Sequence, residues 1–114
     1  MPSYSPVFSA AFIEYTPETR GNTFLVPAGF TAVVRECSCF QDIGAFLYTV
    51  DIQNDLAAPA LTVFAVVQTG VVNYVRGEGR WVVPGGGQIT AEVDTYGDDC
   101  NMYVGGYLLR NSLS

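Results

Sequence analysis

Glycine and proline recur along this chain at an interval that suits short β-strands. Twelve glycines and six prolines are spread over 114 residues, roughly one every six or seven, which is close to the length of a strand plus a turn. Val, Ile, Thr, Phe, Tyr and Trp supply 43 of the residues. Such side chains fit the pleated surface of a sheet better than a helix. We therefore predict an all-β fold.

Eight or nine segments of four to ten residues have strand composition and are joined by tight turns, among them the Pro-Gly run at 84–87. That pattern favours one antiparallel β-sandwich over residues 7–110, in an immunoglobulin-like or jelly-roll order, with a small closed barrel as the alternative. Residues 1–6 should form an extended arm, because their prolines hinder regular structure. Residues 111–114 should form a C-terminal tail.

Three segments carry specific expectations. Strict alternation over residues 30–40 would place Glu36 on the face of Val34, and Arg35 on the face of Cys37; a charged pair in mid-strand indicates an edge or a mating surface. The nearly continuous apolar run at 61–69 predicts a central strand covered on both faces. The Gly-rich residues 76–79 predict a turn.

Charge composition excludes several classes of function. The chain has eleven acidic residues, five basic residues (all Arg) and no histidine, for a net charge of −6. This balance argues against nucleic acid as a partner, and the missing histidine excludes Ser-His-Asp or Cys-His catalysis and His-ligated metals. No signal peptide opens the chain and no run reaches the ~20 apolar residues that a bilayer requires. We expect a non-enzymatic protein without a cofactor or a membrane partner.

Cys37, Cys39 and Cys100 are expected to be reduced thiols that act as small apolar side chains. Neighbours at i and i+2 on an extended strand seldom form a disulfide, and C-x-C without histidine matches zinc sites poorly. An odd number of cysteines without a signal peptide also indicates a reducing compartment.

Asp94, Asp98 and Asp99 form an acidic cluster ahead of Asn101. Carboxylate and amide oxygens are the ligands that Ca²⁺ prefers, but the spacing does not match an EF-hand loop. Aspartate and glycine also stabilise ordinary turns between strands. We predict a turn, with a calcium site as the alternative.

Several residues are candidates for an interface with other subunits. Trp81, the only tryptophan, suits a core or interface anchor, with an exposed sugar platform as the alternative. Glycines within a strand indicate either a close approach of a neighbouring subunit or an internal bulge. The predicted interface residues are Pro2, Tyr4, Arg35, Trp81, Tyr103, Gly105, Gly106 and Tyr107.

Four motifs between about Phe24 and Leu109 make the chain resemble a known group of proteins. They are Pro27-Ala28-Gly29, Val33-Val34-Arg35, Arg80-Trp81-Val82-Val83-Pro84-Gly85-Gly86 and Gly106-Tyr107-Leu108-Leu109. The pattern is similar to that of small β proteins encoded among the virion genes of tailed bacteriophages, especially those of high-GC actinobacterial hosts. This resemblance implies a non-enzymatic virion component with a β-sandwich fold, a place in the tail tip or fibres, and assembly in several copies.

We therefore expect a phage tail protein that is made in the host cytoplasm and incorporated into the virion, where it binds identical subunits and other virion proteins. A capsid decoration protein is the alternative within the same class. A receptor- or carbohydrate-binding adhesin that uses Trp81, Tyr96 and the acidic loop is the alternative from another class, and a small hydrolase is the least favoured.

Overall fold

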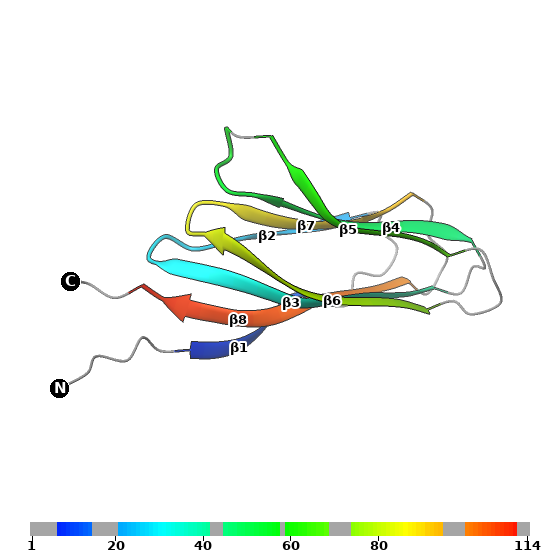
Figure 1. Cartoon of the computed structure of the whole chain (residues 1–114), viewed down its shortest axis with the longest axis horizontal. Coiled ribbons are helices and arrows are strands. Elements are labelled where there is room, and N and C mark those ends of the chain that lie inside the picture. Colours follow the sequence, from blue (N-terminus) through cyan, green and yellow to red (C-terminus); the bar gives the residue numbers. More distant parts are fainter. Residues whose placement is uncertain are drawn as a thin grey trace.

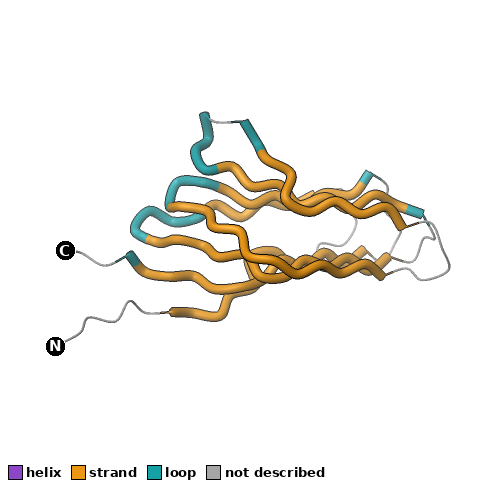
Figure 2. Tube along the Cα trace, in the orientation of Figure 1, coloured by secondary structure: helices purple, strands orange, loops and turns teal. Residues whose placement is uncertain are grey.

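The computed structural model describes residues 7–14, 21–41, 45–57, 59–68, 74–94 and 100–111. Regular structure in these residues is entirely β-strand, so they contain no helix that could cross a membrane (Figures 1 and 2). The predicted arm at 1–6 and all but the first residue of the predicted tail lie outside them. The strands are β1 (Val7–Glu14), β2 (Gly21–Leu25), β3 (Phe30–Gln41), β4 (Phe46–Gln53), β5 (Leu61–Gln68), β6 (Tyr74–Pro84), β7 (Gln88–Val93) and β8 (Cys100–Arg110).

The strands form two antiparallel sheets in jelly-roll order. Sheet A runs β1-β8-β3-β6 and sheet B runs β2-β7-β4-β5. β1 pairs with β8, β2 with β7, β3 with β6 and β4 with β5, so the chain resembles one long hairpin wrapped into two layers. The predicted antiparallel sandwich is confirmed, and the strand order selects the jelly roll from the two orders that the sequence left open.

The core lies between the two layers and follows the period of two that strands impose. On β4 the inward side chains alternate with partly exposed ones, and β7 does the same. Phe12 of β1 contacts Phe24 of β2, with ring centroids 5.1 Å apart, on one side of the sandwich. Fully buried residues between the sheets include Val34, Cys37, Tyr48, Ile89, Met102 and Val104.

Bulges interrupt the alternation of sheet A along one line across its strands. The register between β1 and β8 shifts between Ala11 and Ile13, and the register of β3 with both neighbours shifts at Arg35. Because of this extra residue, Arg35 and Glu36 both lie outside the core, while Val34 and Cys37 are both 0 % exposed. The predicted strict alternation over 30–40 is therefore wrong: a bulge shifts the side-chain phase by one residue.

Residues 76–79, predicted as a turn, form the middle of the continuous strand β6. A Cβ on Gly77 would overlap the ring of Phe64 from β5, and a Cβ on Gly79 would overlap the ring of Trp81. These glycines make room for two aromatic rings in the sandwich, so they do not reverse the chain. The predicted turn at 84–87 is confirmed, with Gly86 at φ 89°.

β5 is the edge strand of sheet B, so the prediction of a central strand covered on both faces is wrong. Val63, Phe64 and Val66 pack against the core, while Leu61 and Val67 are 62 % and 63 % exposed. β3, which carries the charged pair Arg35 and Glu36, lies between β8 and β6, so it is not an edge strand. The apolar run of β5 therefore includes side chains that pack against the core and side chains that are exposed to water.

Gly106→Ala should destabilise the fold by about 1–3 kcal/mol, the usual cost of overpacking. A Cβ on Gly106 would overlap the backbone carbonyl oxygen of Val33 on the neighbouring strand, and backbone cannot move aside. Gly105→Ala is the matched control, because its Cβ would meet only the mobile end of Tyr103. Urea unfolding of both variants measures the difference; equal losses would contradict this account of Gly106.

Candidate functional site: the outer face of sheet A

The outer face of sheet A carries exposed apolar and aromatic side chains in rows across the strands. Val82 and Tyr107 lie by register on either side of the buried Val33 in one row, and Tyr74 lies opposite Phe40 in another. Val82 is 51 % exposed, Tyr74 46 %, Phe40 44 % and Tyr107 41 %. These four are half of the exposed large hydrophobic residues found among the described ones. Aromatic residues concentrated on one face are typical of protein interfaces.

A depression of about 480 Å³ lies between these rows, at the line of bulges. It is built by the backbone shift at Arg35 and by the absence of side chains on Gly105 and Gly106. Its lining residues come from all four strands of sheet A. They are Ala10, Ala11, Arg35, Glu36, Glu78, Tyr103, Gly106 and Tyr107.

Charged residues surround the depression in an asymmetric way. Glu36 and Glu78 lie opposite each other on β3 and β6, where two like charges repel. Arg76 offsets that repulsion, because its Nη2 lies 3.0 Å from Glu36 Oε2 and 2.6 Å from Glu78 Oε1. Arg35 makes no ion pair with another described residue. Arg35 is therefore a cation of the depression that no described carboxylate engages.

Tyr103 joins the depression to the core. Its ring lies over Gly105, and its backbone carbonyl accepts a hydrogen bond from the hydroxyl of the fully buried Tyr48, at 3.2 Å. Partial burial and the carboxylates of Glu36 and Glu14 raise the pKa of Tyr103. Like any tyrosine hydroxyl at neutral pH, it is protonated and can donate a hydrogen bond, and the raised pKa extends this state to higher pH.

The structure brings four of the predicted interface residues together: Arg35, Tyr103, Gly106 and Tyr107 line one depression. Gly105 lies beneath Tyr103, and the close approach that Gly106 permits is to the backbone of β3 within the same chain. Trp81 does not line the depression. It is half-buried, its ring lies over Gly79, and it packs against the core. It is therefore an anchor in the core and not an exposed sugar platform. Pro2 and Tyr4 lie outside the described residues.

The acidic cluster is only partly described. Asp94 Oδ1 accepts a hydrogen bond from the backbone N–H of Leu47 at 2.8 Å, which ties the end of β7 to β4. Asp98, Asp99 and Tyr96 lie outside the described residues, and no group of three metal-ligating side chains occurs within them. The calcium alternative therefore stays a prediction.

Sequence reasoning missed Phe40, Tyr74, Val82, Glu36 and Glu78 as parts of this face. Phe40 and Tyr74 are paired by register although 34 positions separate them, and the bulge that turns Glu36 outward leaves no signature in the residue types. One signal was present: Arg and Glu in the middle of a strand indicate a polar opening in an otherwise apolar face.

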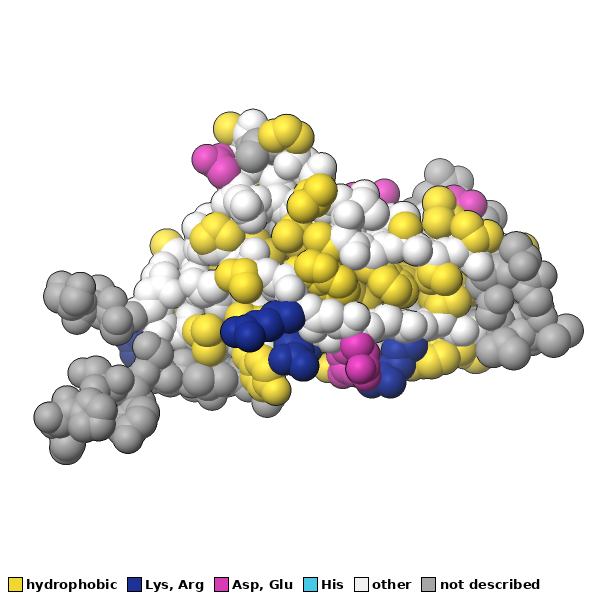
Figure 3. Space-filling view, viewed as in Figure 1, with side chains coloured by type: hydrophobic (Ala, Val, Ile, Leu, Met, Phe, Trp, Pro, Cys, Tyr) yellow, Lys and Arg dark blue, Asp and Glu magenta, His cyan; other side chains and the backbone are white. Residues whose placement is uncertain are grey.

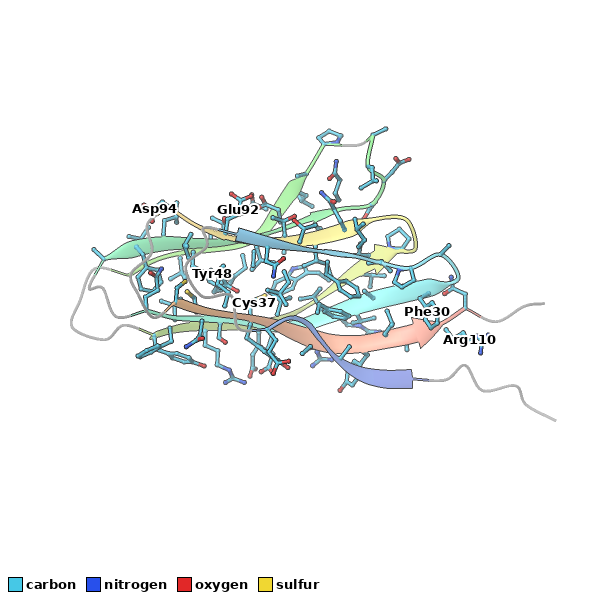
Figure 4. The ribbon with its side chains drawn as sticks, turned by 180° about the vertical axis from the view of Figure 1, so that it is seen from behind. Phe30, Cys37, Tyr48, Glu92, Asp94 and Arg110 are labelled. Atoms are coloured by element: carbon cyan, nitrogen blue, oxygen red, sulfur yellow. The ribbon has the colours of Figure 1, made fainter. Side chains whose placement is uncertain are left out.

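The three cysteines are buried free thiols, as predicted. Burial, with a smaller contribution from Glu36, raises the pKa of Cys37 to about 12, and burial also raises the pKa of Cys39. Tyr48, packed beside them, has its pKa raised mainly by burial. Figure 4 shows Cys37 and Tyr48 between the sheets, away from either outer face. These groups belong to the core.

No protein-family model and no curated protein matches the chain. Solved structures similar to it include the core of Drosophila NLP, with a TM-score of 0.53 and 13 % identity over 93 % of this chain and 99 % of that one; that protein's structure was described for pentamer formation and histone binding. Eiger TNF from S. frugiperda has a TM-score of 0.48 and 7 % identity over 98 % of this chain and 96 % of that one.

A structure of infectious bursal disease virus, Gt strain, is similar over 94 % of this chain but 29 % of its own, with a TM-score of 0.37 and 12 % identity. At 13 % identity, the likeness to the NLP core extends to the fold alone. The strand order is that of a jelly-roll sandwich, which is compatible with a non-enzymatic structural protein.

The free energy of unfolding should fall as the pH rises above 9. The pKa of Cys37 is raised from 9.0 to about 12, so the folded protein keeps a proton that the unfolded chain releases. This contribution is complete below pH 9, and about 1.4 kcal/mol of it is lost by pH 10. Urea unfolding at pH 8 and pH 10 measures the loss. Cys37→Ala should show a smaller decrease; an identical decrease in both proteins would contradict this assignment.

Proposed function

We propose that this protein is a non-enzymatic structural subunit of a tailed-phage virion, and that it assembles with copies of itself and with other virion proteins through the outer face of sheet A. The observation that carries this proposal is the concentration of exposed Val82, Tyr107, Phe40 and Tyr74 around Arg35 and its depression. Tyr, Phe and Arg are enriched in the centres of interfaces.

Two further observations support assembly as the function. The described residues combine a well-filled core with an outer face that leaves large apolar side chains in water, a feature associated with binding surfaces. The fold is also used by the Drosophila NLP core, a protein that forms a pentamer. The tail rather than the capsid is proposed from the sequence motifs, Pro27-Ala28-Gly29 and Arg80-Trp81-Val82 among them.

The chemistry of the face favours binding over catalysis. Its two opposed carboxylates, Glu36 and Glu78, are both engaged by Arg76, and the chain has no histidine to move protons near neutral pH. The adhesin alternative relied on Trp81, whose ring packs against the core.

The purified chain should be an oligomer, and replacing both Val82 and Tyr107 by serine should weaken self-association at least tenfold, as the loss of about 1.4 kcal/mol of interface energy would. Both side chains are exposed, so the fold should persist. Val67→Ser, on sheet B at the end of β5 that pairs with Leu47, is the control. Sedimentation velocity over a range of concentrations measures the difference. A wild-type chain that stays monomeric would refute the proposal.

Mass spectrometry of separated phage heads and tails should find this chain in tails, in a fixed number of copies per particle. Recovery with heads alone would support a capsid decoration protein. Absence from both would refute a virion role while leaving the self-association measured above as an independent result.

A further inference from the structure

The basic residues described in this molecule all lie on one sheet. Every described arginine stands on a strand of sheet A: Arg35, Arg76, Arg80 and Arg110. The same sheet carries three described glutamates, Glu14, Glu36 and Glu78. The described part of sheet B, with the turns that leave it, carries no basic residue and four acidic ones: Asp51, Asp55, Glu92 and Asp94. In Figure 3 the dark blue side chains lie over the lower sheet, and Figure 4 shows Glu92 and Asp94 along the outer side of sheet B. The described basic residues outnumber the acidic ones by one on sheet A, whereas sheet B and its turns carry only acidic residues, so the two sheets differ in the sign of their net charge.

The loop between β4 and β5 stands away from the sandwich on the side of sheet B (Figure 1). Its described residues are all exposed, and Leu56, at 59 %, is one of the most exposed large apolar side chains. The loop is held in shape by two hydrogen bonds: Gln53 Nε2 donates to the Leu56 carbonyl at 3.2 Å, and the Ala57 N–H donates to Asp55 Oδ1 at 2.8 Å. An apolar side chain beside a carboxylate is thus presented at its tip.

The depression on sheet A offers the complementary chemistry. Arg35 has no described ion-pair partner, and it lines the depression beside Ala10, Ala11 and Tyr107. Two carboxylates, Glu36 and Glu78, also line it, and Arg76 forms an ion pair with each of them. A volume of about 480 Å³ is large enough to receive the ends of a leucine and an aspartate side chain. Interface anchors characteristically fill such pockets near the centre of a contact.

We propose that the β4–β5 loop of one copy inserts into the sheet A depression of a second copy, with Asp55 pairing with Arg35 and Leu56 packing on Tyr107. This inference rests on the proposed self-assembly and specifies its geometry. The loop projects from sheet B and the depression opens on the opposite face, so one pair of sandwiches cannot make both contacts at once. The contact is therefore head-to-tail, and it generates a ring if the rotation closes or a filament if it does not.

Charge reversal tests the pairing. Arg35→Asp and Asp55→Arg should each weaken self-association at least tenfold, because each places like charges together in the contact. The double variant, with both reversals in one chain, should recover assembly, and so should an equimolar mixture of the two single variants, in which a native and a reversed pair alternate. Glu92→Arg, on the same sheet as the loop but outside it, is the matched control. It should weaken self-association less than either single reversal does. Sedimentation velocity at fixed ionic strength measures all five samples.

The outcomes separate this inference from the proposed function. A monomeric wild type would overturn both. A wild-type oligomer that neither single reversal weakens would overturn the inference alone and leave the depression to a different partner. Loss of assembly in both single variants without recovery in the double variant or the mixture would also overturn it. Near-ultraviolet circular dichroism tests whether each variant is folded. If a charge reversal does not fold, the neutral substitution at the same position, Arg35→Gln or Asp55→Asn, replaces it.

Discussion

The close approach of β3 to Gly106 is the contact on which the shape of sheet A depends. The Val33 carbonyl occupies the space that a side chain at 106 would need, at the point where the register shifts on β1 and on β3. Bulges bend a strand and shift its side-chain phase. This one turns both Arg35 and Glu36 to the outside while keeping Val34 and Cys37 in the core. The depression and the outward position of Arg35 follow from that single backbone arrangement.

Beside β5 and β6, the core is closed by aromatic rings that pack against glycines. Gly77 leaves space for Phe64 from the opposite sheet, and Gly79 leaves space for the ring of Trp81. The glycines of β6 and the apolar run of β5 are thus parts of the same closure. It leaves Leu61 and Val67 in water along the edge of sheet B. Apolar content in this chain therefore serves both the core and the surface.

The proposed assembly uses features that the fold places on opposite faces. The described arginines stand on β3, β6 and β8 of sheet A. Arg76 neutralises two carboxylates, while Arg35 stays unpaired among the described residues. The loop that carries Asp55 and Leu56 is the turn between β4 and β5, at the tip of the long hairpin that forms the jelly roll. A subunit with different, complementary faces suits propagation from copy to copy.

Local chemistry was enough to predict strands, an antiparallel sandwich, buried thiols and the turn at 84–87, because β-branched residues, alternation and Pro-Gly runs act over a few neighbouring residues. Four residues that line the depression were also singled out from the sequence: Arg35 as a charge in mid-strand, Gly106 as a glycine within a strand, and Tyr103 and Tyr107 as the tyrosines that flank the glycine pair. Strand order, the bulge at Arg35, the continuity of β6 and the edge position of β5 were decided by the tertiary structure. Each depends on which distant strand lies alongside, and a glycine that makes room for Phe64 has the same local sequence signature as a glycine that turns the chain.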